Sequence, residues 1–206
     1  MRSAIGHTLG GITLIIFTGC VQNSSNGAIP NRPTIEDDTA AYAKTTTDAL
    51  QLSEWSSHLA ALELFSVQDK KVLTSSTSRF SALGNENQKP FLVQFFATYC
   101  PPCIKEIPIF NEMATRGTQV IGVSLDVSNH DGLLELIEKH PTKYPVYVLN
   151  PASLETFAEQ LEGLPMTMLV KDRTKVLAVI IGQISTAKLT SWLSKYSNFD
   201  KKPSQK

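Results

Sequence analysis

One stretch near the middle of the chain, FLVQFFATYCPPC (Phe91–Cys103), restricts the possible folds more than any other part of the sequence. Its first half, Phe91–Ala97, is almost continuously apolar, which is typical of a strand buried on both faces of a sheet. Two cysteines follow, separated by two prolines, and a helical pattern of apolar and polar residues begins directly after the second cysteine. The stretch therefore predicts a buried strand that runs through a short turn into a helix, with two thiols at the start of that helix.

Two thiols at a helix N-terminus have a specific chemistry. The i, i+3 spacing of Cys100 and Cys103 lets the two sulfurs meet as a disulfide. The first turn of the helix also stabilises a thiolate, because its unpaired N–H groups and positive dipole end favour negative charge. Taken alone, such a pair is compatible with a redox dithiol, a structural disulfide or half of a metal site.

The composition removes several classes of function. Nineteen basic and nineteen acidic residues cancel, and there is no basic stripe or aromatic ladder, so we expect no nucleic-acid partner. The four histidines are scattered and do not pair with cysteines or carboxylates at ligand spacing, so we expect no metal site. No cofactor is expected beyond the cysteine pair itself. The hydrophobic fraction of 42% is enough for a globular core.

The N-terminus, MRSAIGHTLGGITLIIFTGC, is typical of an export signal. Arg2 precedes a short apolar run that cannot span a bilayer but fits the core of a signal peptide. Phe17 stands where ordinary cleavage needs a small residue, and the ending Phe-Thr-Gly-Cys instead resembles the bacterial lipobox. We therefore expect residues 1–19 to be a lipoprotein-type signal peptide and Cys20 to be lipidated, which explains why the third cysteine has no partner. A plain exported protein with an unpaired thiol is the alternative.

Three further regions follow from the residue types along the chain. Residues 20–49 are rich in Ser, Thr, Asn and Pro and nearly free of large apolar side chains, which indicates a flexible tether. Residues 50–197 carry the apolar residues of a folded domain, and residues 198–206 are expected to be a disordered tail. The tether is long enough to hold the domain just off a membrane surface.

Within the domain, strand patterns alternate with helical patterns. The expected strands are Phe65–Gln68, Val72–Thr74, Phe91–Ala97, Gln119–Leu125, Tyr144–Leu149, Met166–Val170 and Val176–Ile181, the first two forming a hairpin at a sheet edge. The expected helices are a segment after Leu50, one or two turns in Ser76–Leu83, the helix from the cysteines to Thr115, Asn129–His140, Ser153–Leu161 capped by Ser153, and Ser185–Tyr196 capped by Ser185. This order indicates an α/β sheet with helices on both faces.

FATYCPPC after a buried strand, Gly-Leu-Pro-Met-Thr before a strand hairpin, and a closing helix together resemble thioredoxin-fold proteins. The nearer resemblance is to the TlpA/ResA-like branch of exported, membrane-tethered thiol–disulfide oxidoreductases. The run Cys-Pro-Pro-Cys-Ile-Lys-Glu-Ile-Pro, with Glu106 and Pro108 after the second cysteine, carries it. The resemblance covers Leu62–Tyr196. It implies a thioredoxin-like fold, a central mixed β-sheet flanked by helices, with a helix–strand insertion before a cis-proline loop.

The resemblance also implies a role for each matching residue. Cys100 corresponds to the exposed attacking thiol and Cys103 to the buried resolving thiol, and the two form the redox disulfide. Pro165 corresponds to the cis-proline that faces the cysteines. A cis turn there would expose the backbone of Leu164 to pair with an extended substrate segment as an added strand. Leu164 and Pro165 are therefore the expected substrate-binding residues.

The chain departs from the thioredoxin pattern at two positions, Gln94 and Tyr99. Thioredoxin carries a buried acid in the strand before its cysteines, and the matching residue here is Gln94. Glu106, one helical turn beyond Cys103, is a candidate to replace that acid as a catalytic residue, as an acid at this position does in the TlpA/ResA-like branch. The alternative is that Glu106 only complements the helix dipole. Tyr99 replaces the usual tryptophan before the first cysteine, which is expected to alter a packing surface and not the chemistry.

The function implied by the resemblance is the reduction or exchange of disulfides in exported proteins, with the haem-site cysteines of apocytochrome c as one candidate substrate. The expected partners are exported protein thiols and disulfides, a membrane electron donor of the DsbD/CcdA type, and the membrane through the lipid anchor. The expected location is extracytoplasmic, anchored to a bacterial membrane, and periplasmic in a Gram-negative cell.

Two other functions were weighed against this one. A peroxiredoxin-like peroxidase depends on a Thr-x-x-Cys site, and Ala-Thr-Tyr-Cys before the prolines does not supply that spacing. A lipoprotein binding module with a structural Cys100–Cys103 disulfide is the non-enzymatic alternative. Such a short loop constrains the unfolded chain little, so the disulfide would stabilise the fold poorly. The pKa of the Cys100 thiol would distinguish the two, because a catalytic thiol ionises more readily.

Overall fold

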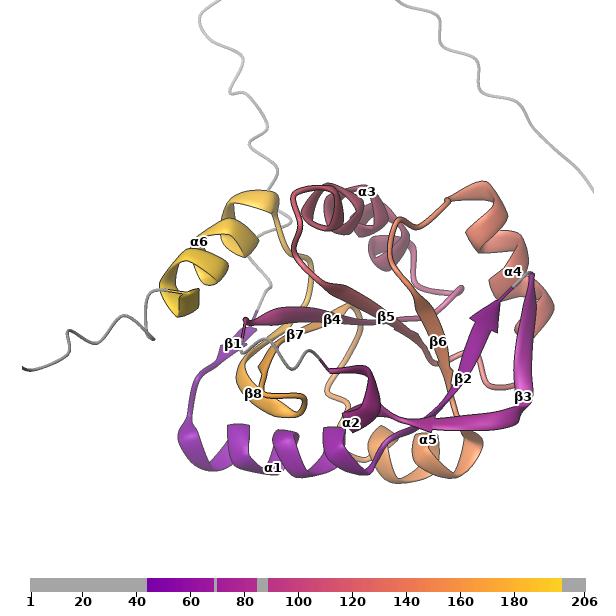
Figure 1. Ribbon diagram of the computed structural model, residues 1–206, viewed down its shortest axis with the longest axis horizontal. Coiled ribbons are helices and arrows are strands. Elements are labelled where there is room, and N and C mark those ends of the chain that lie inside the picture. Colours follow the sequence, from indigo (N-terminus) through magenta and orange to yellow (C-terminus); the bar gives the residue numbers. More distant parts are fainter. Residues whose placement is uncertain (1–43, 69, 85–88, 198–206) are drawn as a thin grey trace, which may run out of the picture. The chain divides into compact units, whose positions relative to one another are not determined.

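The computed structural model describes residues 44–68, 70–84 and 89–197, and its centre is a mixed β-sheet (Figure 1). Within these residues the sheet has eight strands in the order β1-β8-β7-β4-β5-β6-β2-β3. The strands are β1 (Lys44–Thr46), β2 (Glu63–Gln68), β3 (Lys71–Arg79), β4 (Phe91–Phe96), β5 (Val120–Ser124), β6 (Val146–Leu149), β7 (Met166–Lys171) and β8 (Lys175–Ile181). The helices are α1 (Ala49–Ala61), α2 (Phe80–Leu83), α3 (Pro101–Thr115), α4 (His130–Lys139), α5 (Pro151–Ala158) and α6 (Thr186–Ser197).

Strand β4, predicted from the apolar run before the cysteines, lies in the interior of the sheet. Every residue of β4 is buried. It pairs in parallel with β5 and antiparallel with β7. Gln94 is its only polar residue, and the register places Gly122 of β5 on one side of it and Thr167 of β7 on the other. A strand buried on both faces requires cover from both sides of the sheet.

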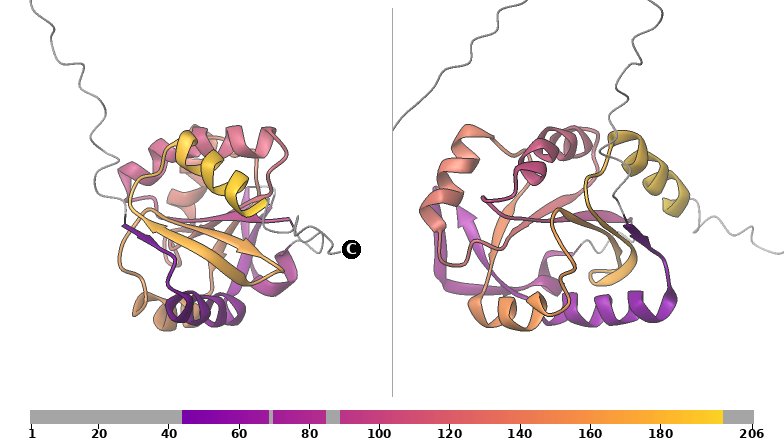
Figure 2. Two further views of the ribbon diagram at one scale, coloured as in Figure 1. Left: turned by 90° about the vertical axis from the view of Figure 1, so that its left-hand side faces the viewer. Right: turned by 180° about the vertical axis from the view of Figure 1, so that it is seen from behind.

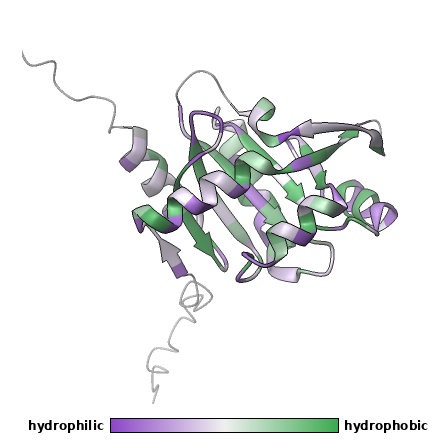
Figure 3. Ribbon diagram, turned by 90° about the horizontal axis from the view of Figure 1, so that it is seen from below, coloured by the Kyte–Doolittle hydropathy of each residue, from purple (hydrophilic) through white to green (hydrophobic). Residues whose placement is uncertain are grey.

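Helices provide that cover and confirm the predicted layered architecture. Helices α1 and α5 lie on one face of the sheet, and α3 and α6 lie on the other (Figures 1 and 2). Figure 3, seen from the side of α1 and α5, shows hydrophobic strands behind helices whose surfaces are more mixed. Helix α1 buries Trp55 and Leu59 against the core, and α3 buries Ile107, Phe110 and Met113. Burial of these apolar side chains is the main free-energy gain that holds the layers together.

The predicted helix–strand insertion lies between β5 and β7. The chain leaves β5, forms α4, returns as β6 in parallel with β5, and then forms α5 before it reaches the turn that precedes β7. Strand β6 extends the sheet beyond β5 and pairs on its other side with β2. The insertion therefore adds β6 on the far side of β5, and β4 still has β5 and β7 as its neighbours.

The segment between the edge hairpin and β4 differs from the sequence-based expectation. Ser76–Leu83 was expected to form one or two helical turns, whereas β3 continues as far as Arg79 and only the short α2 is helical. Strand β3 pairs with β2 at both of its ends, and a register shift between Phe65 and Ser66 places residues 74–76 between the two paired stretches. Pairing on either side keeps this polar Ser/Thr run, which has little helix propensity, in an extended conformation.

The folded region also begins earlier than expected. Residues 20–49 were assigned to a flexible tether, but β1 pairs antiparallel with β8, and the Asp48 side chain caps α1 by accepting from the backbone N–H groups of Leu50 and Gln51. The backbone of β8 offers an edge that a short polar strand can extend. Residues 1–43, with the expected signal peptide and Cys20, lie outside the described residues, as does the expected tail at 198–206.

Two helix caps were predicted, and one of them was wrong. Ser185 caps α6 as expected, since its hydroxyl accepts from the backbone N–H of Lys188 at 3.3 Å. Helix α5 is capped by Asn150, whose side chain accepts from the N–H of Ala152 at 2.9 Å. Ser153 lies inside that helix, and its hydroxyl instead accepts from the N–H of Glu63 at 2.9 Å, which ties α5 to the start of β2.

Candidate active site

Strand β4 delivers the chain to the site through a short turn, and helix α3 begins immediately after Cys100. Cys100 is the N-cap of α3, and its Sγ accepts from the backbone N–H of Cys103 at 3.3 Å. Pro101 and Pro102 occupy the first two helical positions, where a backbone N–H has no partner within the helix and the fixed φ of proline suits the first turn. The residue order Cys-Pro-Pro-Cys therefore builds a helix start with a sulfur as its cap.

The two cysteines form a disulfide, as the resemblance implied, with their Cα atoms 5.3 Å apart. Cys100 was expected to be the exposed thiol, but in this disulfide form it is nearly buried, with 7% of its surface accessible, and Cys103 is fully buried. The side chain of Tyr99 beside them is 73% exposed. Cys100 is thus the sulfur that a protein substrate reaches first, and a thiolate there would be stabilised by the N–H of Cys103 and by the helix dipole.

The turn before β7 contains a cis peptide bond between Leu164 and Pro165. Pro165 is buried and Leu164 is half-buried, and the carbonyl of Pro165 accepts from the N–H of Gly182 at 2.8 Å. Strand β7 starts opposite Phe95 near the end of β4, so this turn lies at the edge of the sheet where β4 leads into the cysteines. The register therefore brings Leu164 and Pro165 to the same end of the sheet as the disulfide.

Glu106 is fully buried on α3, one turn beyond Cys103. Its Oε1 accepts from the backbone N–H of Ile184 at 2.6 Å, and its Oε2 accepts from Gln94 Nε2 at 3.4 Å. Burial raises the pKa of Glu106 to about 7, against the opposing effect of these two donors. Glu106 is thus a carboxyl group that exchanges a proton near neutral pH within one helical turn of the buried cysteine.

Gln94, the residue that replaces the buried acid of thioredoxin, contacts both Cys103 and Glu106 of α3. Its Nε2 donates to the Cys103 carbonyl and to Glu106 Oε2, each at 3.4 Å. Its Oε1 accepts from the hydroxyl of Tyr144 at 3.0 Å. The sequence analysis linked the two residues only through the missing acid, and the structure brings their side chains into contact.

Tyr144 is a site residue that the sequence analysis missed, since it was assigned only to the start of a strand. It precedes β6 and is 6% exposed. Its burial, together with the nearby Glu106 carboxyl, raises the pKa of its phenol. The only signal for it in the sequence was a tyrosine placed before a buried strand, which does not distinguish a core residue from a site residue.

Asp126 was also missed. It is buried two residues after the end of β5. It accepts from the Thr98 N–H at 2.9 Å, from the Thr98 hydroxyl at 2.7 Å and from the Ser124 hydroxyl at 2.7 Å. Thr98 lies in the turn before Cys100, so Asp126 braces the loop that carries the attacking sulfur. An acid at the end of a strand parallel to β4 was the available signal, because the carboxyl ends of parallel strands meet at one edge of the sheet.

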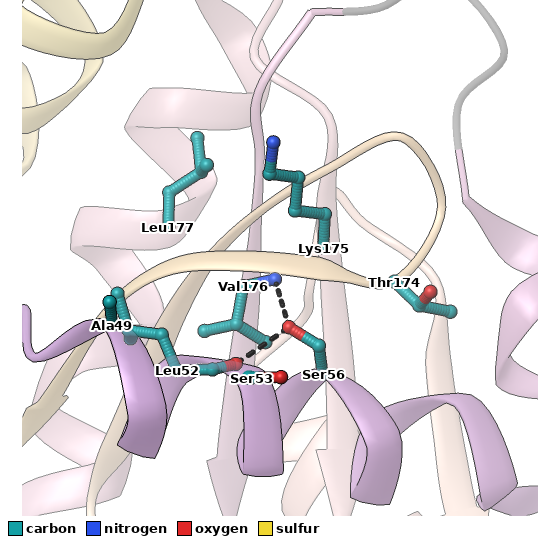
Figure 4. Close-up of a pocket in the computed structure, with 8 residues that line it drawn as sticks. All are labelled: Ala49, Leu52, Ser53, Ser56, Thr174, Lys175, Val176 and Leu177. Atoms are coloured by element: carbon teal, nitrogen blue, oxygen red, sulfur yellow. Dashed lines mark hydrogen bonds between the residues drawn. The ribbon is translucent and has the colours of Figure 1, made fainter.

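The surface of the described residues is hollowed at several places, and two of these hollows differ in their relation to the site. One, of about 490 Å³, lies between α1 and β8, where Ser56 Oγ bridges the Leu52 carbonyl and the Val176 N–H (Figure 4). None of the site residues above lines it. The other, of about 390 Å³, is formed by Val127–Asp131 next to Asp126. It adjoins the active-site turn, since Asn129 Nδ2 donates to Thr98 Oγ1 at 3.4 Å.

The described segments hold neither a cluster of metal ligands nor a membrane-spanning helix. Within them, no group of three or more His, Cys, Asp or Glu side chains is arranged to hold a metal ion. None of their helices has both the length and the apolar character needed to cross a bilayer.

Comparisons with known proteins agree with this geometry. The thioredoxin family model matches residues 71–142. The thiol–disulfide oxidoreductase ResA of Bacillus cereus is 24% identical over 128 residues, which cover 60% of this chain and 73% of that protein.

Solved structures give the same fold. One is a thiol:disulfide interchange protein DsbE from Chlorobium tepidum, with a TM-score of 0.51, 20% identity, and coverage of 67% of this chain and 93% of that one. Another is the thioredoxin domain of a thiol–disulfide oxidoreductase from Bacteroides vulgatus, with a TM-score of 0.52, 20% identity, and coverage of 66% and 94%. These likenesses establish the expected thioredoxin-like fold.

Proposed function

Because this chain is a TlpA/ResA-like thioredoxin-fold protein and a thiol–disulfide oxidoreductase by type, we propose that it reduces or exchanges disulfides of exported proteins through Cys100 and Cys103. The observation that carries the proposal is the asymmetry of the pair. Both sulfurs belong to the first turn of one helix, Cys100 reaches the surface, and Cys103 is fully buried. Cys100 then attacks the substrate, and Cys103 breaks the mixed disulfide that forms.

The reductive cycle starts from the dithiol form. The Cys100 thiolate attacks one sulfur of a substrate disulfide, which forms a mixed disulfide and releases the other substrate sulfur as a thiolate. The Cys103 thiolate then attacks Cys100 Sγ, breaks the mixed disulfide and releases the second substrate thiolate. Two electrons have passed to the substrate, and the protein is left with the Cys100–Cys103 disulfide. The same steps in reverse oxidise a dithiol.

We assign the proton of the resolving step to Glu106. Cys103 is buried and must lose its proton before it can attack. A carboxyl group with a pKa of about 7 accepts and returns a proton readily near neutral pH. Thioredoxin uses a buried acid at the position of Gln94. In this proposal Glu106 performs the task of that acid, which is more than complementing the helix dipole.

Substrate binding is proposed for the cis turn. Leu164 and Pro165 lie at the end of the sheet that carries the disulfide, and an extended substrate segment would pair with the Leu164 backbone as an added strand. The exposed ring of Tyr99 supplies apolar surface next to Cys100 for the same segment.

The biological setting is proposed from the sequence. A lipidated Cys20 would hold the protein outside the cytoplasm, anchored to a bacterial membrane by several acyl chains on one residue. A membrane electron donor of the DsbD/CcdA type would return the pair to the dithiol form, and no bound cofactor is needed for that cycle. The haem-site cysteines of apocytochrome c are the candidate substrate.

Trapping of the mixed disulfide tests the proposed function. A Cys103→Ser variant expressed in its native compartment should accumulate disulfide-linked adducts with exported proteins, because the resolving sulfur is missing. The matched Cys100→Ser variant should accumulate none, because the remaining thiol is buried. Both would be read on non-reducing gels after acid quenching. If the Cys103→Ser variant carries no more adducts than the Cys100→Ser variant, the exchange function is wrong.

A further inference from the structure

The buried carboxyl of Glu106 is surrounded by neutral partners. From its own helix it is near Cys103, from β4 it meets the amide of Gln94, and from the loop before α6 it meets the N–H of Ile184. Tyr144 is a further titratable group close to it, since the Glu106 carboxyl helps to raise the pKa of the Tyr144 phenol. None of these partners is a cation, so the balance between the carboxylate and the carboxylic acid depends on the orientation of a few dipoles.

The amide of Gln94 is the dipole that can reverse. Its NH₂ end donates, which stabilises a carboxylate, whereas its oxygen would favour only the protonated acid. In the structure the NH₂ end points at two acceptors, the Cys103 carbonyl and Glu106 Oε2. A backbone carbonyl and a carboxylate can only accept, so this orientation satisfies both. Reversal would place the amide oxygen against them.

The hydroxyl of Tyr144 holds the other end of that amide. It donates to Gln94 Oε1 at 3.0 Å across 50 residues of sequence. Its ring packs edge-on against Phe110 of α3, with ring centroids 6.3 Å apart. Gly122, which pairs with Gln94 in the sheet, leaves room for the ring, because a Cβ there would lie 3.0 Å from Tyr144 Cε2. The absence of a side chain at Gly122 therefore allows the phenol to approach the amide.

We propose that Tyr144 and Gln94 are positioning residues, in which the Tyr144 hydroxyl fixes the orientation of the Gln94 amide so that its NH₂ group faces the Glu106 carboxyl and the Cys103 carbonyl. The pair thereby sets which protonation state of Glu106 is favoured. The consequence for catalysis rests on the proposed function, because it matters only if Glu106 handles the proton of Cys103.

The proposal gives a direction for the Glu106 titration. Without the Tyr144 hydroxyl, the Gln94 oxygen loses its donor, and the amide can turn to accept from a protonated Glu106. The carboxylic acid is then favoured, and the pKa of Glu106 rises above its present value of about 7. The rise should be about half to one pH unit, because the change weakens one hydrogen bond to an ionised group.

Carbon-13 NMR of the glutamate side-chain carboxyl groups tests this in the oxidised full chain without substrate. The Glu106 signal is assigned as the one lost in Glu106→Gln. Tyr144→Phe should raise its titration midpoint by about 0.5–1 pH unit. Tyr147→Phe is the matched control, since it removes a hydroxyl from a half-buried tyrosine of β6, the strand that follows Tyr144. It should leave the midpoint of Glu106 unchanged. A midpoint in Tyr144→Phe that matches Tyr147→Phe, or falls, overturns the proposal.

A measurement on the unaltered protein guards against a folding failure of Tyr144→Phe. The side-chain amide nitrogen-15 signal of Gln94 should titrate with the Glu106 midpoint, and this titration should vanish in Glu106→Gln. An amide signal that does not change with pH would overturn the proposal. Since neither experiment uses a substrate, a failure of mixed-disulfide trapping would refute the proposed function and leave this result standing.

Discussion

Glu106 makes the stability of the oxidised protein depend on pH in the direction opposite to that of a salt-bridged carboxylate. Burial raises its pKa from the ordinary 4.5 to about 7. Between these two values, the folded protein binds a proton that the unfolded chain has released. The free energy of unfolding must therefore fall as the pH rises through this window.

The size of the effect follows from the two pKa values. A rise from 4.5 to about 7, at about 1.36 kcal/mol per pH unit, lowers the free energy of unfolding by about 3 kcal/mol between pH 4 and pH 8. Glu106→Gln removes the titrating proton and with it this contribution. The new amide also changes the contacts with Ile184 and Gln94, but that change is the same at every pH and does not alter the slope.

Urea denaturation of the disulfide-intact protein at pH 4, 6 and 8 measures the contribution directly. The stability difference between the wild-type protein and Glu106→Gln should fall by about 3 kcal/mol from pH 4 to pH 8. Glu155→Gln, which removes an exposed carboxylate from α5, should run parallel to wild type. A difference from Glu106→Gln that stays constant within about 0.5 kcal/mol would mean that folding leaves the pKa of Glu106 at its ordinary value, and the reasoning would fail.

Three other substitutions test the framework around the site. Asp126→Ala should lower the free energy of unfolding by about 2–4 kcal/mol in urea denaturation, because the half-buried N–H and hydroxyl of Thr98 and the hydroxyl of Ser124 lose their acceptor. It should also slow disulfide exchange with a small aromatic disulfide, and a variant as stable and as active as wild type would contradict the bracing role. Gly122→Ala should cost about 1–3 kcal/mol and shift the ring resonances of Tyr144, whose Cε2 would lie 3.0 Å from the new Cβ; unchanged ring resonances would argue against this contact. Ser153→Ala should cost about 1–3 kcal/mol, because a backbone N–H at the start of β2 loses its acceptor, while circular dichroism should show no loss of helix. A loss of helical signal would mean that Ser153 supports α5 as a cap after all.

The redox pair could be predicted from the sequence because its parts are local. Cys100 and Cys103 are three residues apart, and the strand before them and the helix after them are encoded in adjacent residues. Pro165 lies far along the chain, and its place opposite β4 depends on the pairing of β7. It was predicted through the family motif and not through any local pattern.

The network around Glu106 could not be predicted in the same way. Its contacts with Ile184 and Gln94 span 78 and 12 residues, and the contact between Tyr144 and Gln94 spans 50. From the sequence alone, a glutamate after a cysteine pair could equally be an exposed residue of the first helical turns or a buried one. Burial by other elements decides its pKa, and burial is a property of the assembled layers.

The differences in secondary structure have the same origin. The Ser/Thr run of β3 has no strong local preference, and the pairing of the residues on either side of it with β2 keeps it extended. The tripeptide Lys44–Thr46 is too short and polar to be recognised as a strand, and the free edge of β8 gives it a partner. Ser153 is a common helix cap by residue type, but the nearby N–H of Glu63 engages its hydroxyl instead.

The sequence by itself determined the buried strand, the helix that starts at Cys100, and the pairing of two thiols at that start, because spacing and residue type are sufficient for these features. Only the tertiary structure decided that Glu106 is buried, that Gln94 faces it, and that Tyr144 fixes the Gln94 amide. The physical reason is that the charge state of a carboxyl group depends on the water removed around it and on the dipoles brought near it. Both come from strands and loops that the chain supplies dozens of residues away.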